Sequence, residues 1–447
     1  MTLPHDLIGA AILGSAFAAV FVAAELWRRF GHPDPEWTRK LVHTGGGLAS
    51  LLYPWLIYSP WVVLGMALVA SGVLAAAGRG HLLSSVHGVN RRSQGSEYYP
   101  LAVALVYVLS YGRPWLFVAS ILTLAVSDTC AALIGTRYGS IRYTVEEETK
   151  SLEGSLAFLL VAFLAIHIPT LLMTDIPRPV CVLAALLVAV IVTGFEAISL
   201  RGADNLFVPV AVCVILAKIT TKPLAEVAAQ NFSIIAIATI FIILARRMRT
   251  LNAGAVIALI LFAFGAWSLG SWQWALPVLL GFVAYHLAQT ATPPPDAAAP
   301  AVRVRLVVRA VLPPLFPLIL SNMFTLEQFF YGPYLATGAT VTGLTLWTYL
   351  RRQRPAALRG AFACSLGGAL LVLLVPWALQ GLGWRSLAAP AALSLLAIAA
   401  NALVVERLRP PQDNDLWRAG KMLLCYAVTA AIIAAQQLGL AALWRPE

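Results

Sequence analysis

Charge is what this sequence has least of. Only 11% of its 447 residues are Asp, Glu, Lys or Arg, whereas 60% are hydrophobic. A soluble domain of this length needs a more highly charged surface. Cysteine is scarce as well: the five cysteines contain no Cys-x-x-Cys pair, which argues against a metal or disulfide framework. These absences exclude a nucleic-acid binder, a secreted disulfide scaffold and a disordered tail.

Long uncharged runs make up most of the chain. Residues 41–78, 250–295, 360–384 and 422–444 each reach or exceed the roughly 20 apolar residues that a helix needs to cross a bilayer. The first run, residues 7–24, has neither a basic segment before it nor a convincing cleavage site after it, so we expect a retained helix. The sequence predicts an all-α polytopic integral membrane protein with about 14–16 transmembrane helices.

The basic residues indicate how the chain is oriented. They occur in short groups between the apolar runs rather than in one patch. If the first helix runs from outside to inside, most of the 31 basic residues lie on the inner side, as the positive-inside rule requires. We therefore expect a multi-pass protein of a bacterial inner membrane, with its polar loops in the cytosol.

The acidic residues divide the chain. Of its 20 acids, 14 precede residue 249, and acids of membrane proteins tend to lie where function needs them. We predict that residues 1–249 form the domain that carries the chemistry. Residues 250–447 are predicted to form an additional helical membrane domain of uncertain role.

Four polar segments of the first part interrupt or border apolar runs, all on the predicted cytosolic side. In the first, Arg39, Lys40 and His43 precede the glycines at 45–47. Glycines allow backbone N–H groups to approach a phosphate. The alternative is a positively charged anchor followed by small residues that let helices pack.

The second and third segments supply carboxylates. Glu97 lies at a membrane boundary, where it could accept a proton or be only an interfacial charge. Asp128 follows fourteen uncharged residues and therefore lies in or at the edge of a span, where an unpaired carboxylate is costly. Such a carboxylate suits Mg²⁺, which is held by one or two carboxylates together with substrate phosphates.

The third segment continues to Lys150 and Glu153, which are three residues apart and are predicted to share a face of the next helix. An ordinary surface ion pair is the alternative for these two residues. In the fourth segment, Asp204 and Asn205 lie in a short polar stretch that by itself predicts only a turn.

Taken together, the segments resemble the CTP-dependent lipid-alcohol kinases, the family of phytol, dolichol and fungal-type diacylglycerol kinases. Five motifs carry the resemblance, in the family's order and within roughly the first 210 residues: Arg39-Lys40-x-x-His43, Glu97-Tyr98-Tyr99-Pro100, Asp128-Thr129-x-Ala131-x-x-x-Gly135-x-Arg137-x-Gly139, Lys150-Ser151-x-Glu153-Gly154-Ser155 and Gly202-x-Asp204-Asn205-x-x-x-Pro209. The resemblance implies transfer of the γ-phosphoryl group of CTP to a membrane isoprenoid alcohol, such as phytol, geranylgeraniol or a polyprenol. The products would be the lipid monophosphate and CDP.

The resemblance also implies roles for single residues. Phosphoryl transfer needs positioning and charge neutralisation more than covalent chemistry. Asp128 and Asp204 would hold Mg²⁺. The groups expected to contact the nucleotide phosphates are Arg39, Lys40, Gly135, Arg137, Gly139 and Asn205. The expected catalytic set is His43, Glu97, Asp128, Lys150 and Glu153, and which of His43, Glu97 and Glu153 receives the proton of the alcohol is left open.

Two other functions remain open at this stage. The aspartate motif followed by Lys-x-x-Glu-Gly also resembles the CDP-diacylglycerol synthases, which would make a CDP-lipid from CTP and a lipid phosphate. A transporter with Asp128, Glu196 and Asp204 along a polar path is the alternative from another class.

The second part is open too. Residues 254–277 resemble the opening of the phytyl-phosphate kinase family, which would imply a second kinase-like module. The simpler interpretation is a scaffold that widens the lipid site or forms a homo-oligomer interface.

Overall fold

The computed structural model describes residues 3–79, 95–146, 148–199, 202–246, 251–293, 304–353, 356–408 and 415–440. The chain divides into two compact units, residues 1–233 and 234–447. The division falls within helix α12 (Leu224–Arg246). The boundary predicted at residue 249 lies outside the described residues.

The all-α polytopic class is confirmed. Eleven helices of the described residues are long and apolar enough to cross a membrane, and Pro60–Ala76 and Glu97–Leu109 form shorter apolar helices. Further short helices, such as α2 (Pro35–Ser50) and α11 (Asp204–Ile219), lie between them. The sequence predicted 14–16 spans from uncharged runs. Such runs count shorter apolar helices together with helices long enough to cross a membrane.

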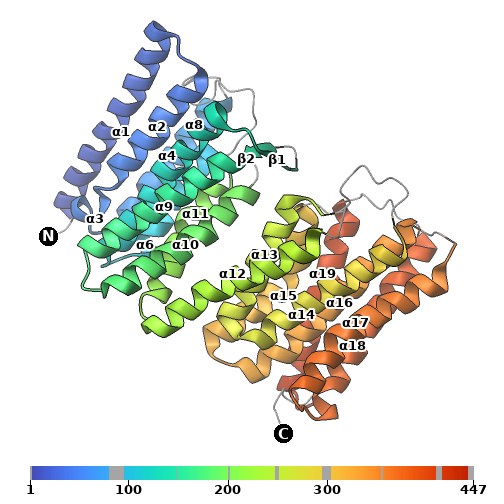
Figure 1. Ribbon diagram of the computed structural model, residues 1–447. Helices are drawn as coiled ribbons and strands as arrows, with labels where there is room; N and C mark the ends of the chain where they lie inside the picture. Colours follow the sequence, from blue (N-terminus) through green and yellow to red (C-terminus); the bar gives the residue numbers. More distant parts are fainter. Residues whose placement is uncertain are drawn as a thin grey trace. The chain divides into compact units, whose positions relative to one another are not determined.

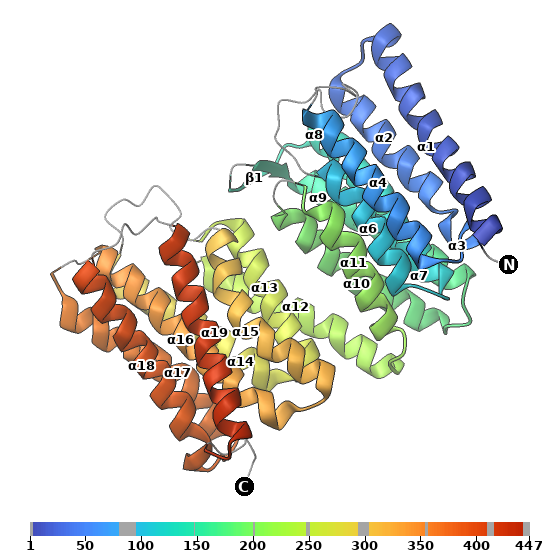
Figure 2. The ribbon, with the colours of Figure 1, turned by 180° about the vertical axis from the view of Figure 1, so that it is seen from behind.

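The first unit is a helical bundle with one small hairpin (Figures 1 and 2). Besides α2 and α11, its helices are α1 (Leu3–Gly31), α3 (Tyr53–Leu56), α4 (Pro60–Arg79), α6 (Gly95–Leu109), α7 (Pro114–Leu122), the π-helix η1 (Thr123–Ser127), α8 (Asp128–Tyr138), α9 (Leu152–Leu172) and α10 (Arg178–Ile198). The hairpin consists of β1 (Arg142–Val145) and β2 (Glu148–Ser151), paired antiparallel with Tyr143 opposite Lys150.

The helix starts in this unit follow local sequence signals. α2 begins with Pro35 after Asp34, whose carboxylate accepts the backbone N–H of Glu36 at 2.8 Å. α9 begins after Ser151, whose hydroxyl accepts the N–H of Gly154 at 3.2 Å. The start of α2, the end of α8, the hairpin and the start of α9 lie at the same end of the unit (Figure 1). This end gathers the polar segments.

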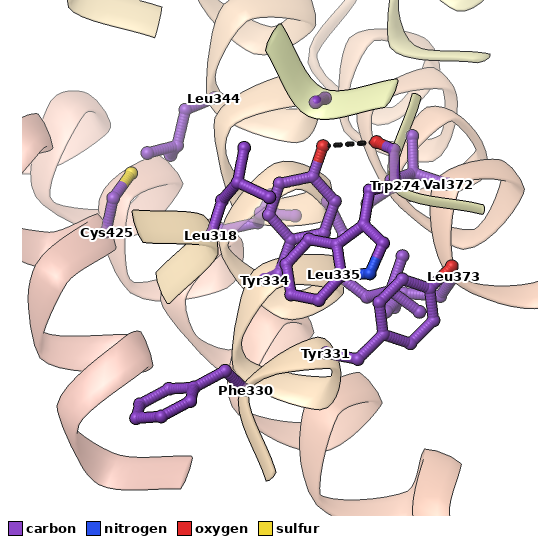
Figure 3. Close-up of a cluster of buried hydrophobic side chains, with 14 of the residues drawn as sticks. Trp274, Leu318, Phe330, Tyr331, Tyr334, Leu335, Leu344, Val372, Leu373 and Cys425 are labelled. Atoms are coloured by element: carbon purple, nitrogen blue, oxygen red, sulfur yellow. Dashed lines mark hydrogen bonds between the residues drawn. The ribbon is translucent and has the colours of Figure 1, made fainter. Parts of the chain in front are cut away.

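The second unit contains the last part of α12 and seven further helices of the described residues. They are α13 (Ala253–Gly270), α14 (Trp272–Ala291), α15 (Val304–Phe324), α16 (Glu327–Gln353), α17 (Leu358–Leu379), α18 (Trp384–Leu408) and α19 (Asp415–Gln437). Much of α16 is buried against its neighbours. Trp274, Tyr331 and Tyr334 form an aromatic cluster in the core of this unit, in which the Tyr334 hydroxyl donates to the Trp274 carbonyl at 2.5 Å (Figure 3).

Charged groups are few inside the second unit. Arg351 pairs with Glu406 at 2.5 Å, and the ammonium of Lys421 donates to the hydroxyl of Thr348 at 2.8 Å. A small cavity of about 130 Å³ between α13, α14, α15 and α16 has a largely apolar lining. These contacts are those of a packed helical scaffold.

Candidate active site

One cavity of about 1140 Å³ in the first unit receives side chains from all four polar segments. Its polar end is lined by Arg39, Lys40, His43, Asp128, Gly135, Arg142, Glu148, Lys150, Glu196, Asp204 and Asn205. Apolar residues of α1, α2, α4 and α6 line the rest. The cavity therefore joins a charged compartment to an apolar groove.

Asp128 is the centre of the charged compartment. Its carboxylate oxygen Oδ2 lies 2.6 Å from the ammonium of Lys40 and 3.5 Å from Nε2 of His43. Lys40 is buried, so the pair is shielded from solvent. One helical turn separates Lys40 and His43 on α2, which is why both reach the same carboxylate.

The tautomer of His43 follows from its second contact. Nε2 also lies 3.0 Å from the backbone carbonyl oxygen of Leu124. A carbonyl can only accept, so we assign the ring proton to Nε2, and Nδ1 keeps a lone pair in the neutral ring. The ring packs edge-on against Tyr99, with centroids 4.9 Å apart. His43 is therefore a fixed side chain with one basic nitrogen.

The local helix geometry positions Asp128. The π-helix η1 ends at Ser127, directly before Asp128, and such wide turns often occur at functional sites. Thr44 of α2 and Thr129 of α8 join their hydroxyls at 2.8 Å, next to the Lys40–Asp128 pair. A Cβ at Gly47 would lie 2.2 Å from that of Ala125 in η1, so this glycine allows α2 to approach η1.

The glycines at 45–47 lie inside α2 and not at its start, which weakens the prediction that their backbone N–H groups approach a phosphate. A Cβ at Gly45 would lie 2.9 Å from Val20 of α1, whereas a Cβ at Gly46 would meet nothing within 4 Å. Gly45 and Gly47 are thus packing residues on two sides of α2. Gly46 faces the cavity.

A second ion pair lies across the compartment. The ammonium of Lys150 lies 2.7 Å from Oε1 of Glu196 and also donates to the backbone carbonyl of Glu196, at the end of α10. Burial alone would lower the pKa of Lys150, but the carboxylates of Glu196 and Asp204 raise it above its ordinary value. Lys150 therefore carries a positive charge at neutral pH.

Asp204 and Asn205 open α11 at the edge of the same cavity. The Asp204 carboxylate accepts the N–H of Asn205 at 3.1 Å, and it lies near enough to Asp128 for the two charges to repel. The turn predicted from the sequence precedes the helix, where Gly202 has a φ of +81°.

Lys150 and Glu153 do not share a helix face, so that prediction was wrong. Lys150 belongs to β2, and Ser151 caps the helix in which Glu153 lies. The strand turns Lys150 into the cavity, whereas the carboxylate of Glu153 accepts the N–H groups of Ser140 and Ile141 at 3.0 and 3.1 Å. Glu153 thereby holds the turn between α8 and β1.

Three other residues expected at the site do not line the cavity. Arg137 lies over the ring of Tyr138 at 5.6 Å from its centroid. Glu97 lies in the first turn of α6, and its neighbours Tyr99 and Pro100 line the cavity in its place. A Cβ at Gly139 would lie 2.2 Å from the carbonyl oxygen of Gly135, so Gly139 serves the close packing at the end of α8.

The structure adds residues that the motifs did not single out. Glu196 is the partner of Lys150, and Arg142 and Glu148 of the hairpin line the cavity. No sequence pattern singled out Arg142 or Glu148, because four-residue strands are too short for a periodic pattern to be detected. The acid at Glu196, near the end of an apolar run, was the one available signal.

Curated proteins are similar to part of this sequence. A curated relative named "Phytol kinase" from Synechocystis sp. is 34% identical over 204 residues, which are 45% of this chain and 87% of that protein. The chain belongs to the phytol kinase family. A second relative, named "Probable phytol kinase 1, chloroplastic", from Glycine max, is 30% identical over 166 residues, or 34% of this chain and 54% of that protein. No family model and no solved structure matches the chain.

For a phytol kinase family member, the donor set of the cavity is compatible with a divalent cation. Asp128 and Asp204 line the same cavity, and their carboxylates are close enough to repel each other electrostatically. Among the described residues, no group of three His, Cys, Asp or Glu side chains forms a complete metal cage. Mg²⁺ needs no such cage, since it is commonly held by one or two carboxylates, water and substrate phosphates.

Proposed function

We propose that the protein is a kinase that transfers the γ-phosphoryl group of CTP to a membrane isoprenoid alcohol, phytol or a related prenyl alcohol. The observation that carries the proposal is one cavity with two lysine–carboxylate pairs at its polar end and an apolar groove at the other. Membership of the phytol kinase family supports the same chemistry. CTP as the donor rests on the family resemblance.

Mg²⁺ bound by Asp128 and Asp204 would neutralise negative charge on the donor phosphates. The charge of the cavity lining supports this requirement. Five acids line the cavity, Glu36, Asp128, Glu148, Glu196 and Asp204, against four bases, Arg39, Lys40, Arg142 and Lys150. The lining alone would therefore not attract a polyphosphate, and a divalent cation would supply the missing positive charge.

Different residues of the chain then bind the phosphates and accept the proton of the alcohol. Lys40, Lys150 and Arg39 contact phosphate oxygens, and their charges stabilise the transferring group. The hydroxyl oxygen of the alcohol forms a bond to the γ-phosphorus while the bond from that phosphorus to the β-phosphate oxygen breaks and CDP leaves. Nδ1 of His43 receives the hydroxyl proton, because the Leu124 carbonyl holds the ring proton on Nε2.

The test uses purified protein in detergent with Mg²⁺ and γ-labelled CTP, offered phytol, geranylgeraniol, a long polyprenol and diacylglycerol side by side. Asp128→Asn should abolish lipid labelling, because it removes a metal ligand and the partner of Lys40. Asp175→Asn is the matched control, since Asp175 is an exposed carboxylate between α9 and α10 that does not line the cavity.

Two results would contradict the proposal. Equal labelling by wild type and Asp128→Asn would remove this cavity from the reaction. Absence of labelled lipid, together with pyrophosphate release when phosphatidic acid is supplied, would identify a cytidylyltransferase instead. The active site should also face the cytosol of a bacterial inner membrane. The enzyme should therefore phosphorylate the alcohol when CTP is added to the outside of sealed inverted vesicles.

A further inference from the structure

The apolar part of the cavity is a groove with one closed end. Its base is the face of α2 that carries Gly46 and Ser50, and its sides include Phe17 of α1 and Met66 of α4. The exposed side chain of Val69 on α4 also lines it, so the groove is open sideways to the surroundings of the helices. In a membrane protein, that opening admits a molecule from the lipid phase.

The far end of the groove is closed by tight contacts between α1 and α3. A Cβ at Gly9 would lie only 2.0 Å from the carbonyl oxygen of Leu56, so the two backbones touch there. The carboxylate of Asp6 accepts the N–H groups of Tyr58 and Ser59 at 2.7 and 3.1 Å. Tyr53 is buried and lines the cavity above this closure.

The length of the groove fits part of a prenyl chain. α4 lines the cavity from Val63 to Leu74, which spans about 16 Å at 1.5 Å per residue. An extended isoprene unit adds four carbon–carbon bonds along the chain, about 5 Å in total given bonds of about 1.5 Å in a zigzag. The groove thus accommodates roughly three isoprene units below the reacting hydroxyl.

Two glycines leave this path open at different depths. Gly46 lies one helical turn beyond His43, about 4.5 Å along α2, and its absent side chain leaves free space. Gly14 of α1 also lines the cavity, and a Cβ there would meet nothing within 4 Å. It lies about 7.5 Å farther along the groove than Gly46, because Gly14 precedes Val20, the neighbour of Gly45, by six residues or about 9 Å of α1, and Gly46 is about 1.5 Å beyond Gly45.

We propose that the groove between α1, α2 and α4 binds the isoprenoid chain of the alcohol substrate, and that Gly46 and Gly14 determine how long a chain it accepts. The inference rests on the proposed kinase function and adds its chain-length selectivity. A side chain at Gly46 would block the path after about one isoprene unit. A side chain at Gly14 would block it only after two or three units.

The experiment measures kcat/KM for alcohols of one, two and four isoprene units with the full-length protein. Gly46→Leu should reduce kcat/KM for the two-unit and four-unit alcohols at least about tenfold relative to the one-unit alcohol, as expected for a blocked apolar pocket. Gly14→Leu should reduce kcat/KM about tenfold for the four-unit alcohol but much less for the two-unit alcohol. The specific expectation is that Gly46→Leu discriminates against shorter alcohols than Gly14→Leu does.

Gly72→Leu is the matched control. Gly72 is a helical glycine of α4 at which a Cβ would also meet nothing within 4 Å, but it does not line the cavity. Its chain-length profile should equal that of the wild type. Size-exclusion chromatography shows whether each variant is folded, and Gly14→Leu on the open side of the groove carries the test if Gly46→Leu does not fold.

The outcomes separate the two claims. Wild-type phosphorylation of all three alcohols with the same chain-length profile in the Gly46 and Gly14 variants would overturn the groove assignment while the kinase function stands. A wild type that phosphorylates no alcohol would overturn the proposed function, and the groove assignment with it. A profile that shifts toward shorter chains in the two groove variants and not in Gly72→Leu supports the assignment.

Discussion

At the scale of single residues, the site depends on how each lysine is paired. Lys40 and Lys150 each contact a carboxylate, Asp128 and Glu196, and both lysines line the proposed phosphate end of the cavity. A lysine held in this way is a pre-oriented positive charge rather than a flexible one. Glu196 then affects the reaction through the charge state of Lys150.

The pH profile of Glu196→Gln tests this dependence. Glu196 helps raise the pKa of Lys150, so its neutral replacement should lower that pKa, and the ammonium should be lost at a lower pH than in wild type. The alkaline limb of kcat/KM for the nucleotide should accordingly move to lower pH. Glu226→Gln, which removes an exposed partner of Lys222 at 2.7 Å, is the control. Equal alkaline limbs in all three proteins would show that Lys150 does not act as a charge on the nucleotide.

Two neighbouring glycines of α2 should respond oppositely to alanine. Gly47→Ala should destabilise the protein by about 1–3 kcal/mol, because its Cβ would lie 2.2 Å from that of Ala125 and the core is overpacked. Gly46→Ala should be neutral or stabilising by up to about 1 kcal/mol, since it gains helix propensity and meets no neighbour. Thermal unfolding in detergent measures both. A lower midpoint for Gly46→Ala than for Gly47→Ala would contradict the assigned packing.

At the scale of elements, the hairpin is the part of the site that composition did not predict. β1 and β2 carry Arg142, Glu148 and Lys150 to the cavity, and their anchor is the carboxylate of Glu153. The family resemblance implied a catalytic role for Glu153, whereas its contacts with Ser140 and Ile141 are those of a positioning residue.

Glu153→Ala distinguishes the two roles. Loss of the carboxylate frees the N–H groups of Ser140 and Ile141, so hydrogen exchange in residues 140–151 should accelerate and KM for the nucleotide should rise. Mass spectrometry of the exchanged protein and steady-state kinetics provide the two readouts. A fall in kcat with unchanged exchange would instead indicate that Glu153 takes part in the chemistry. Glu226→Ala is a surface control on α12.

At the scale of the whole molecule, the chain has two compact units, and the candidate site lies in the first. The Synechocystis relative matches 204 residues over 87% of its length, so it is about half as long as this chain. A phytol kinase family member therefore does not require a second unit of this size. The role of the second unit, as a scaffold, an oligomer interface or a second kinase-like module, stays a prediction.

Truncation tests how far the first unit suffices. A chain ending at Arg246 retains the first unit and all of α12, and it should still phosphorylate the alcohol with kcat within about threefold of the full protein, because every residue of the cavity precedes that point. Labelled lipid from CTP is the measurement. A truncated chain that is folded, elutes as a single species and yet forms no labelled lipid would show that the second unit contributes to catalysis.

The sequence alone determined the class of the protein and the segments that carry its polar residues. Hydrophobicity is a property of each segment, so spans can be recognised without knowing what they pack against. The position of Asp128 within the apolar span Pro114–Tyr138 followed in this way. The motif order also placed Lys40, His43 and Asp204 among the candidate residues before their contacts were known.

Only the tertiary structure decided which of these residues meet. The Lys150–Glu196 pair joins positions 46 residues apart in sequence, and Lys40 and Asp128 are 88 apart. It also decided that Gly45 and Gly47 pack against other helices while Gly46 opens on the groove. Such pairings depend on how helices are rotated and how closely they approach, and no local pattern along the chain encodes that geometry.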